Sequence, residues 1–241
     1  MTKHANVLNT KHIKAFRKGF SKFIMPYKFA IDELNPKINI LREEFSYIHD
    51  YNPIENVSSR VKTIESIIKK AERKNIPLSI PSIKRHIKDI AGVRVTCSFI
   101  SDIYKIQEMI ESQADVEVLS VKDYFKHPKP NGYRSLHLLI EIPVFLSNDV
   151  KHIPVELQIR TIAMDFWASL EHKIFYKHNV DVPQYLVDEL KEAATIASEL
   201  DHKMERLNKE ISHYKKLEPN EKKSPLLGEF RKRFQIPEGT S

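Results

Sequence analysis

The spacing of hydrophobic residues changes from helical to strand-like near residue 90 and returns to helical spacing after residue 160. Over residues 13–24 and 27–50, apolar side chains recur every three or four positions, which predicts helices. The pair Asn52-Pro53 predicts a break after them. We expect a further helix that starts at residues 56–59 and ends near residue 75, with a buried stripe formed by Val57, Val61, Ile64, Ile68 and Ala71.

Beyond residue 89, apolar and polar residues alternate in four segments, which predicts strands. These segments are residues 92–99, 116–121, 135–145 and 152–160, with a helix expected over 102–112. Strands mixed with helices indicate an α/β or α+β fold, and we expect a mixed sheet of about five strands flanked by helices. The polar, proline-containing segment 122–133 predicts a surface loop.

The last third of the chain predicts helices again. Residues 161–177 place Trp167, Leu170 and Ile174 on an apolar side. The next helix carries apolar residues that step by four and three, the spacing of a heptad seam. Packing within the monomer and a subunit interface both explain this seam, which consists of Leu186, Leu190, Ala193, Ala197, Leu200, Met204, Leu207 and Ile211.

Composition and charge narrow the class of protein. A chain of 241 residues, 41% of them hydrophobic, can bury one core with helical extensions. It has no apolar run of the roughly eighteen residues that a membrane helix needs, and we expect a cytoplasmic protein. The single cysteine, Cys97, excludes an intramolecular disulfide and a cysteine-clustered zinc site.

The net charge of +7 equals the seven lysines and arginines that precede Asp32, the first acidic residue. We expect this basic arm to form an amphipathic helix. Docking of the helix on its own domain is one interpretation, and binding of RNA or a membrane surface is the other.

Alternation along the strands gathers polar side chains on one face of the sheet. In residues 152–160, Val155, Leu157 and Ile159 share one face, and the polar residues between them share the other. A solvated face of an antiparallel sheet would give the same pattern. On the polar face we expect Arg94, Thr96, Ser135, His137, Glu156, Gln158 and Arg160.

Candidate ligand-binding residues flank these strands. The pair Asn131-Gly132 signals a tight turn, and Tyr133 after it has a ring that can stack on a base. Candidate phosphate-binding residues are Lys122, Lys126, Lys129 and Arg134. A second basic cluster, typical of a polyphosphate clamp or of a solvated helix face, consists of Arg60, Lys62, Lys69, Lys70, Arg73 and Lys74.

Acidic Asp89, next to the first predicted strand, is expected to share a magnesium ion with Glu156, because Mg²⁺ takes few carboxylates and relies on substrate phosphates. The sequence contains neither GxxxxGK[ST] nor GxGxxG, which excludes P-loop and Rossmann nucleotide sites.

Four ordered segments resemble the RelA/SpoT family of guanosine tetra- and pentaphosphate synthetases. They are RVKTIESIIKK, DIAGVRV, HPKPNGYRSLH, and VELQIRT with the following DFWASLEHKIFYK. The resemblance implies a nucleotidyltransferase-like synthetase domain over residues 51–180, an N-terminal extension over 1–50 and a C-terminal extension over 181–241. It also implies a homotetrameric synthetase without hydrolase activity.

The resemblance further implies the reaction and its residues. The β,γ-pyrophosphate of ATP moves to the 3′-hydroxyl of GDP or GTP, and AMP is released. By resemblance, Arg60, Lys62 and Lys70 bind ATP, Asp89 and Glu156 hold Mg²⁺, and Glu156 activates the attacking hydroxyl. The guanine nucleotide is expected to contact Lys129, Asn131, Tyr133, His137, Gln158 and Arg160.

Long members of the family have a second arginine on the far side of the adenine, and no residue of this sequence matches it. Arg94 is expected to have a structural role. Two alternatives to this synthetase remain. One is a transferase of nucleoside monophosphates, which classically carries a Gly-Ser pair and a DxD motif that this sequence lacks. The other is a non-catalytic RNA-binding protein that uses the basic arm.

Overall fold

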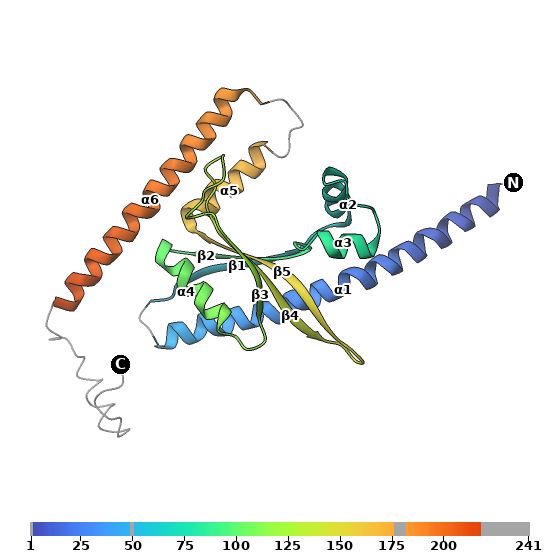
Figure 1. Cartoon of the computed structure of the whole chain (residues 1–241), viewed down its shortest axis with the longest axis horizontal. Helices are drawn as coiled ribbons and strands as arrows, with labels where there is room; N and C mark the ends of the chain where they lie inside the picture. The colour runs from blue at the N-terminus through green and yellow to red at the C-terminus, as the bar shows by residue number, and fades with distance from the viewer. Residues whose placement is uncertain (1, 49–50, 176–181, 218–241) are drawn as a thin grey trace, which may run out of the picture. The chain divides into compact units, whose positions relative to one another are not determined.

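The structure is a computed structural model that describes residues 2–48, 51–175 and 182–217. The chain forms two compact units, Met1–His202 and Lys203–Ser241, with the boundary inside the last helix. The elements, in chain order, are α1 (Thr2–Ile48), β1 (Ile54–Val61), α2 (Ile64–Arg73), α3 (Ile80–His86), β2 (Ala91–Cys97), α4 (Ile100–Glu111), β3 (Glu117–Asp123), β4 (Leu136–Phe145), β5 (Val150–Thr161), α5 (Ile162–Phe175) and α6 (Gln184–Leu217) (Figure 1).

The sheet of the first unit has five strands in the order β1-β2-β5-β4-β3. Strands β2 and β5 run parallel, and the other neighbours run antiparallel. This mixed sheet flanked by helices confirms the fold class expected from the alternation. The parallel pair lies near the centre, where each strand has a neighbour on both sides.

One face of the sheet packs on α1, which lies along it (Figure 1). Helix α1 buries Phe23, Tyr27, Ala30, Leu34 and Ile38 at helical spacing, against strand residues of one parity such as Val93 and Leu157. Full burial of each large apolar side chain contributes about 1.5–3 kcal/mol. The main core therefore covers one face of the sheet and leaves the polar positions on the other.

Helix α1 is longer than the spacing predicted, because it continues through Pro26 and Pro36. A proline inside a helix removes one backbone donor. Burial of Phe23 and Tyr27 on either side of Pro26 ties both halves to the same core, which outweighs that loss. The side chains of residues 1–18, which carry most of the basic arm, lie outside the described part of the chain, as does the charged tail after Leu217.

The predicted helix start at residues 56–59 is wrong, because residues 54–61 form strand β1. Val57 pairs with Val95 and Arg60 pairs with Gly92 in an antiparallel ladder. Helix α2 begins only after Thr63, whose side chain accepts a hydrogen bond from the Ser66 amide. Arg60 therefore lies on a strand, Lys62 follows it, and only Lys70 lies on the helix.

The apolar sides predicted for the last helices are partly wrong. In α5, Trp167 is buried together with Met164 and Ala168, whereas Leu170 and Ile174 are exposed. In α6 the buried positions are Ala194, Ser198, Asp201 and Glu205. Of the predicted seam, Leu190 and Ala197 pack within the first unit, against a cluster that includes Trp167. The exposed members are Leu186, Ala193, Leu200, Met204, Leu207 and Ile211.

The described end of the second unit, Lys203–Leu217, continues α6. Ion pairs along it join Arg206 to Glu210 and Lys209 to Glu205. Among the described helices, none combines the length and the apolar character that crossing a membrane requires.

Candidate functional site

A cavity of about 440 Å³ lies on the polar face of β2 and β5. Its floor includes Gly92, which pairs with Arg60 on one side and with Glu156 on the other. A Cβ at position 92 would meet the backbone oxygens of Arg60 and Glu156 at 3.9 Å, an ordinary van der Waals contact, so a methyl group would fit at this point of the floor. The cavity is lined by Ser58, Ser59, Arg60, Lys62, Asp89, Gly92, Val93, Arg94, Glu156, Gln158, Arg160, Ala168, Ser169, His172 and Lys173.

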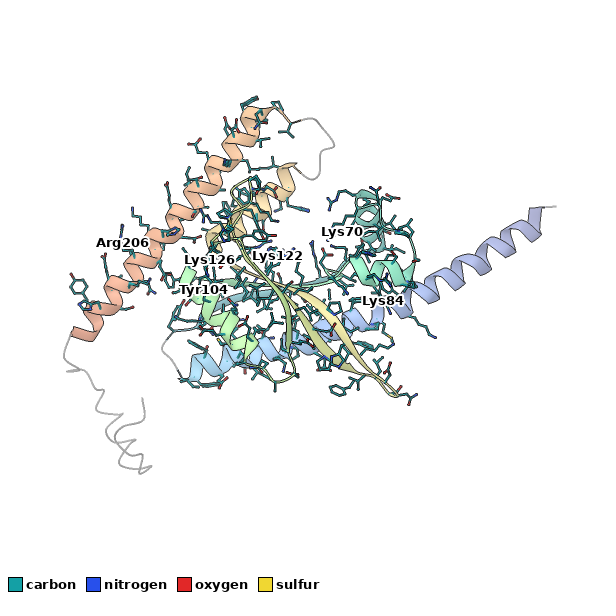
Figure 2. All side chains as sticks on the ribbon, in the orientation of Figure 1. Lys70, Lys84, Tyr104, Lys122, Lys126 and Arg206 are labelled. Atoms are coloured by element: carbon teal, nitrogen blue, oxygen red, sulfur yellow. The ribbon has the colours of Figure 1, made fainter. Side chains whose placement is uncertain are left out.

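Arg60, Lys62 and Asp89 line one wall of the cavity, and Lys70 contacts Asp89 from α2; we call these four residues the donor wall. The Nζ atoms of Lys62 and Lys70 each lie 2.5 Å from the Asp89 Oδ2 atom. Burial alone would raise the pKa of Asp89, but the hydrogen bonds and charges of the two lysines outweigh burial and lower it. Figure 2 shows Lys70 on α2.

The second oxygen of Asp89, Oδ1, is buried and has no hydrogen-bond partner among the described residues. A buried acceptor without a partner costs free energy, which a bound cation would relieve. The described residues contain no group of three or more His, Cys, Asp or Glu side chains that could hold a metal. A cation here would therefore depend on two carboxylates and on substrate phosphates, the coordination typical of Mg²⁺.

Glu156 lies at the centre of a hydrogen-bonded row on β5. Gln158 Nε2 donates to the Glu156 Oε2 atom at 2.8 Å, and Arg160 donates to the Gln158 Oε1 atom at 2.7 Å. The Nδ1 atom of His137, on the neighbouring strand β4, lies 3.5 Å from Glu156 Oε1.

Burial raises the pKa of Glu156, but the contacts with His137 and Gln158 outweigh burial and lower it. The negative charge of Asp89 acts in the opposite direction, which indicates that the two carboxylates lie close enough to interact. Glu156 is therefore ionised at neutral pH, next to a second ionised carboxylate.

Parallel pairing of β2 with β5 explains this arrangement. Arg94 pairs with Gln158 and Thr96 with Arg160, so the polar positions of both strands point to the same face. His137 pairs with Gln158 from the other side. The structure thus brings most of the predicted polar face together, but Thr96 and Ser135, which were also expected there, are buried and do not line the cavity.

The loop between β3 and β4, residues 124–135, is called the acceptor loop here. Figure 2 shows Lys122 and Lys126 where β3 passes into it. In the described residues, the loop members Lys129, Asn131 and Tyr133 do not line the cavity. Asn131 instead donates to the Glu171 side chain at 3.5 Å.

Tyr133 is only 7% exposed. The Lys129 Nζ atom lies 4.7 Å from its ring centre, and the Arg160 guanidinium carbon lies 5.1 Å from it. Cations at these distances are attracted to an aromatic face. The ring on which a base was expected to stack is therefore covered by neighbouring side chains.

His137 connects the acceptor loop to Glu156. Its Nε2 atom lies 2.9 Å from the Tyr133 hydroxyl oxygen. Burial lowers the pKa of His137, so the ring is neutral at neutral pH and carries one N–H. We assign that hydrogen to Nδ1, facing Glu156, because Nε2 then accepts the hydrogen bond from the Tyr133 hydroxyl.

Helix α5 supplies site residues that the sequence reasoning did not single out. Asp165, in its first turn, accepts from Arg94 NH1 at 2.7 Å and from Arg160 NH1 at 3.1 Å. Asp165 thereby links the two neighbouring strands, and Arg94 also lines the cavity rather than serving structure alone. The signal was present in the helical spacing of Asp165, Ala168, Ser169, His172 and Lys173.

Known proteins match the chain over most of its length. Residues 59–181 match the region found in RelA / SpoT proteins. The Bacillus subtilis GTP pyrophosphokinase YwaC is 52% identical over 206 residues, which cover 86% of this chain and 98% of that protein. GTP pyrophosphokinase YjbM from the same organism is 40% identical over 194 residues, covering 80% and 90%.

Solved structures agree with these matches. The small alarmone synthetase 2 of B. subtilis is 55% identical, with a TM-score of 0.71 and coverage of 78% of this chain and 97% of that one. The small alarmone synthetase 1 of B. subtilis bound to its product pppGpp is 40% identical, with a TM-score of 0.76 and coverage of 80% and 98%. Sequence and structure together show that this chain belongs to the RelA/SpoT family.

Proposed function

We propose that this chain is a GTP pyrophosphokinase that transfers the β,γ-pyrophosphate of ATP to the 3′-hydroxyl of GDP or GTP and releases AMP. The observation that carries the proposal is the cavity in which ionised Glu156 faces the donor wall of Arg60, Lys62, Lys70 and Asp89. The names of the similar B. subtilis enzymes, GTP pyrophosphokinases and alarmone synthetases, support the same reaction.

The residues act mainly by positioning and by neutralising charge, as phosphoryl-type transfer requires. Arg60, Lys62 and Lys70 bind the phosphates of ATP from the donor wall. Glu156 accepts the proton of the 3′-hydroxyl as the hydroxyl oxygen attacks the β-phosphorus of ATP. The bond from the β-phosphorus to the oxygen shared with the α-phosphorus breaks, and AMP leaves with that oxygen.

The acceptor side orients the attacking nucleotide. The acceptor loop receives the guanine base on Tyr133 after the covering side chains move away, and Lys129 and Asn131 contact the nucleotide. The hydrogen bond from Gln158 fixes one oxygen of Glu156 and leaves the other facing His137. Arg160, held by Asp165, places a positive charge beside Tyr133.

Asp89 and Glu156 would hold a magnesium ion, because the free Oδ1 atom of Asp89 and an ionised neighbour fit a hard cation. The ion, when bound, would neutralise charge on the phosphates that move.

The proposed enzyme has one catalytic domain with two extensions, forms a homotetramer and acts in the cytoplasm. The synthetase domain spans residues 51–180, and residues 1–50 and 181–241 are extensions. The exposed apolar residues of α6, such as Leu200 and Ile211, support a homotetrameric assembly through this helix. The buried free thiol of Cys97 suits the cytoplasm, which keeps thiols reduced.

Product analysis tests the function directly. Purified protein is incubated with Mg²⁺, labelled ATP and either GDP or GTP, and the nucleotides are separated. We expect AMP together with ppGpp or pppGpp. Release of inorganic pyrophosphate without AMP would indicate transfer of a nucleoside monophosphate instead. No product, under conditions in which a verified synthetase is active, would overturn the proposal.

A further inference from the structure

A second apolar cluster lies apart from the main core and joins three segments that are distant in the sequence. Its buried members are Tyr133 of the acceptor loop, Met164, Trp167 and Ala168 of α5, and Ala194 of α6. Leu190 and Ala197 of α6 pack against the same cluster. The tyrosine expected to receive the base thus rests on a small cluster that α6 helps to build.

Contact between the loop and α6 is closest at Gly132, which has a φ of +85°. A Cβ built there would lie 2.6 Å from the Cβ of Ala194 and 3.5 Å from the Lys191 carbonyl oxygen. Side chains do not approach to 2.6 Å, so the loop and the helix meet this closely only because residue 132 has no side chain and residue 194 has a methyl group.

The loop is held rigidly at this point. The Gly132 amide donates to the Lys129 carbonyl at 2.8 Å, and the Tyr133 amide donates to the Asn131 side chain at 3.3 Å. A displacement of Gly132 is therefore transmitted directly to the next residue, Tyr133.

Helix α6 is in turn bonded to α5 at one point and to the end of β5 at another. Trp167 Nε1 donates to the Leu190 carbonyl at 3.0 Å. Near the other end of the contact, the Thr161 hydroxyl donates to Asp201 at 2.7 Å and accepts from the Met164 amide at 3.2 Å. Since both bonds involve buried groups, the helix is a rigid support for the loop.

We propose that residues 190–197 of α6 form a wall of the acceptor site, and that Ala194 is a positioning residue that sets the affinity for the guanine nucleotide. The inference rests on the proposed function, because it takes the acceptor loop to bind that nucleotide. A larger side chain at 194 displaces Gly132 and rotates the ring of Tyr133 away from the position fixed by His137.

The effect should be selective for the acceptor. The donor wall lies on β1, on α2 and ahead of β2, and none of its members Arg60, Lys62, Lys70 and Asp89 belongs to the second cluster in the described chain. Among the described residues, the second cluster reaches the cavity at Ala168 alone. Binding of ATP should therefore depend less on the position of α6 than binding of the guanine nucleotide does.

Ala194→Leu tests the inference, with Thr195→Leu as the control, because Thr195 is exposed on the same turn of the helix and lies outside the apolar seam. We expect Ala194→Leu to raise KM for GDP by about tenfold or more, since small displacements of positioning groups have large effects. The KM for ATP and the affinity for a non-hydrolysable ATP analogue should change by less than about twofold if the donor site is untouched. Thr195→Leu should leave all three values unchanged.

A second pair of variants keeps the test decisive if Ala194→Leu fails to fold, which far-UV circular dichroism would reveal. Gly132→Ala places a methyl group against Ala194 and should also raise KM for GDP. Ala194→Gly, added to Gly132→Ala, removes the clash and should recover part of the loss, although the positive φ remains unfavourable for alanine.

Equal changes in both KM values, no change in either, or no recovery in the double variant would each overturn the inference. A failure of the proposed function is recognised separately, because the unmodified protein would then release no AMP. If the unmodified protein is active and Ala194→Leu behaves like Thr195→Leu, only the inference fails.

Discussion

The donor wall and the acceptor loop lie on the same face of the sheet, but their side chains are in different states. Asp89 of the donor wall faces an open cavity and is held by two lysines. Tyr133 of the acceptor loop is almost fully covered, and Lys129 lies against its ring. The donor half is therefore formed before a ligand binds, whereas the acceptor half requires movement of at least one side chain.

The donor wall and helix α6, which supports the acceptor loop, also differ in the pKa of a buried carboxyl group. The lysines around Asp89 lower its pKa. Asp201, on the α6 side, is bonded to the Thr161 hydroxyl, and burial raises its pKa to about 6 even though that bond acts to lower it. Two lysines thus offset the burial of Asp89, where the polyphosphate is expected to bind, whereas the contacts of Asp201 do not offset its burial.

Glu156 lies between the two halves, and its substitution should have the largest effect. Glu156→Gln keeps the size of the side chain but removes the base, so kcat should fall by a factor on the order of 10²–10⁴. Binding of GDP and of an ATP analogue should change little, because the amide preserves most contacts. Steady-state kinetics and equilibrium binding measure the two quantities.

Glu141→Gln is the matched control, because Glu141 lies on neighbouring strand β4 and does not line the cavity. Normal turnover by Glu156→Gln would exclude Glu156 as the base. Equal loss in both variants would indicate damage to the sheet rather than to the chemistry.

Lys70→Met should weaken ATP binding at the donor wall without weakening GDP binding at the acceptor loop. It leaves Asp89 with one lysine and removes one cation from the expected phosphate site. Hydrogen bonds to charged groups contribute about 1.5–3 kcal/mol, so KM for ATP should rise roughly tenfold to a hundredfold. The KM for GDP should stay within about twofold if the two halves are independent.

Lys69→Met provides the control, because Lys69 is the exposed neighbour on the same helix. A similar rise in both variants would mean that general positive charge, rather than the position of Lys70 beside Asp89, attracts ATP. A rise in KM for GDP equal to that for ATP would remove the distinction between the halves.

The sequence predicted the polar face of the sheet well, because strand alternation is a local property. A period of two places Glu156, Gln158 and Arg160 on one side whatever the strand pairs with. Strand β1 was missed because Val57, Val61, Ile64 and Ile68 are spaced by three and four, as in a helix. Val57 and Val61 also fit a strand, and pairing with β2, a tertiary contact, decides between the two.

The covering of Tyr133 could not be predicted from the sequence, because it depends on contacts between distant segments. Lys129 reaches the ring across the turn at Gly132, which the Asn131-Gly132 pair predicted, but the turn packs against Ala194, about sixty residues later, and that contact is tertiary. The buried stripe of α6 was also hidden, since Ala194, Ser198 and Asp201 are small or polar and give no hydrophobic signal.

Asp201→Asn should have the smallest effect. It tests whether the burial of the Asp201 carboxylate on α6 raises its pKa, in contrast to Asp89. A pKa of about 6 in the folded protein, above the usual 3.8, means that the folded state binds the proton more tightly. This group therefore makes the protein more stable as the pH falls from 7.5 to 5, by about 1 kcal/mol. Asparagine can still accept the hydrogen bond from Thr161 but does not titrate, so the variant should lack this part of the pH dependence.

Denaturant unfolding of both proteins at pH 7.5 and pH 5 measures the difference, and Asp188→Asn on the exposed part of α6 serves as the control. The unfolding free energy of Asp201→Asn should exceed that of the unmodified protein at pH 7.5, and the gap should narrow at pH 5. A gap that is independent of pH would show that Asp201 is compensated in the folded state. The α6 side would then resemble the donor wall, and the contrast between the two halves would rest on the covering of Tyr133 alone.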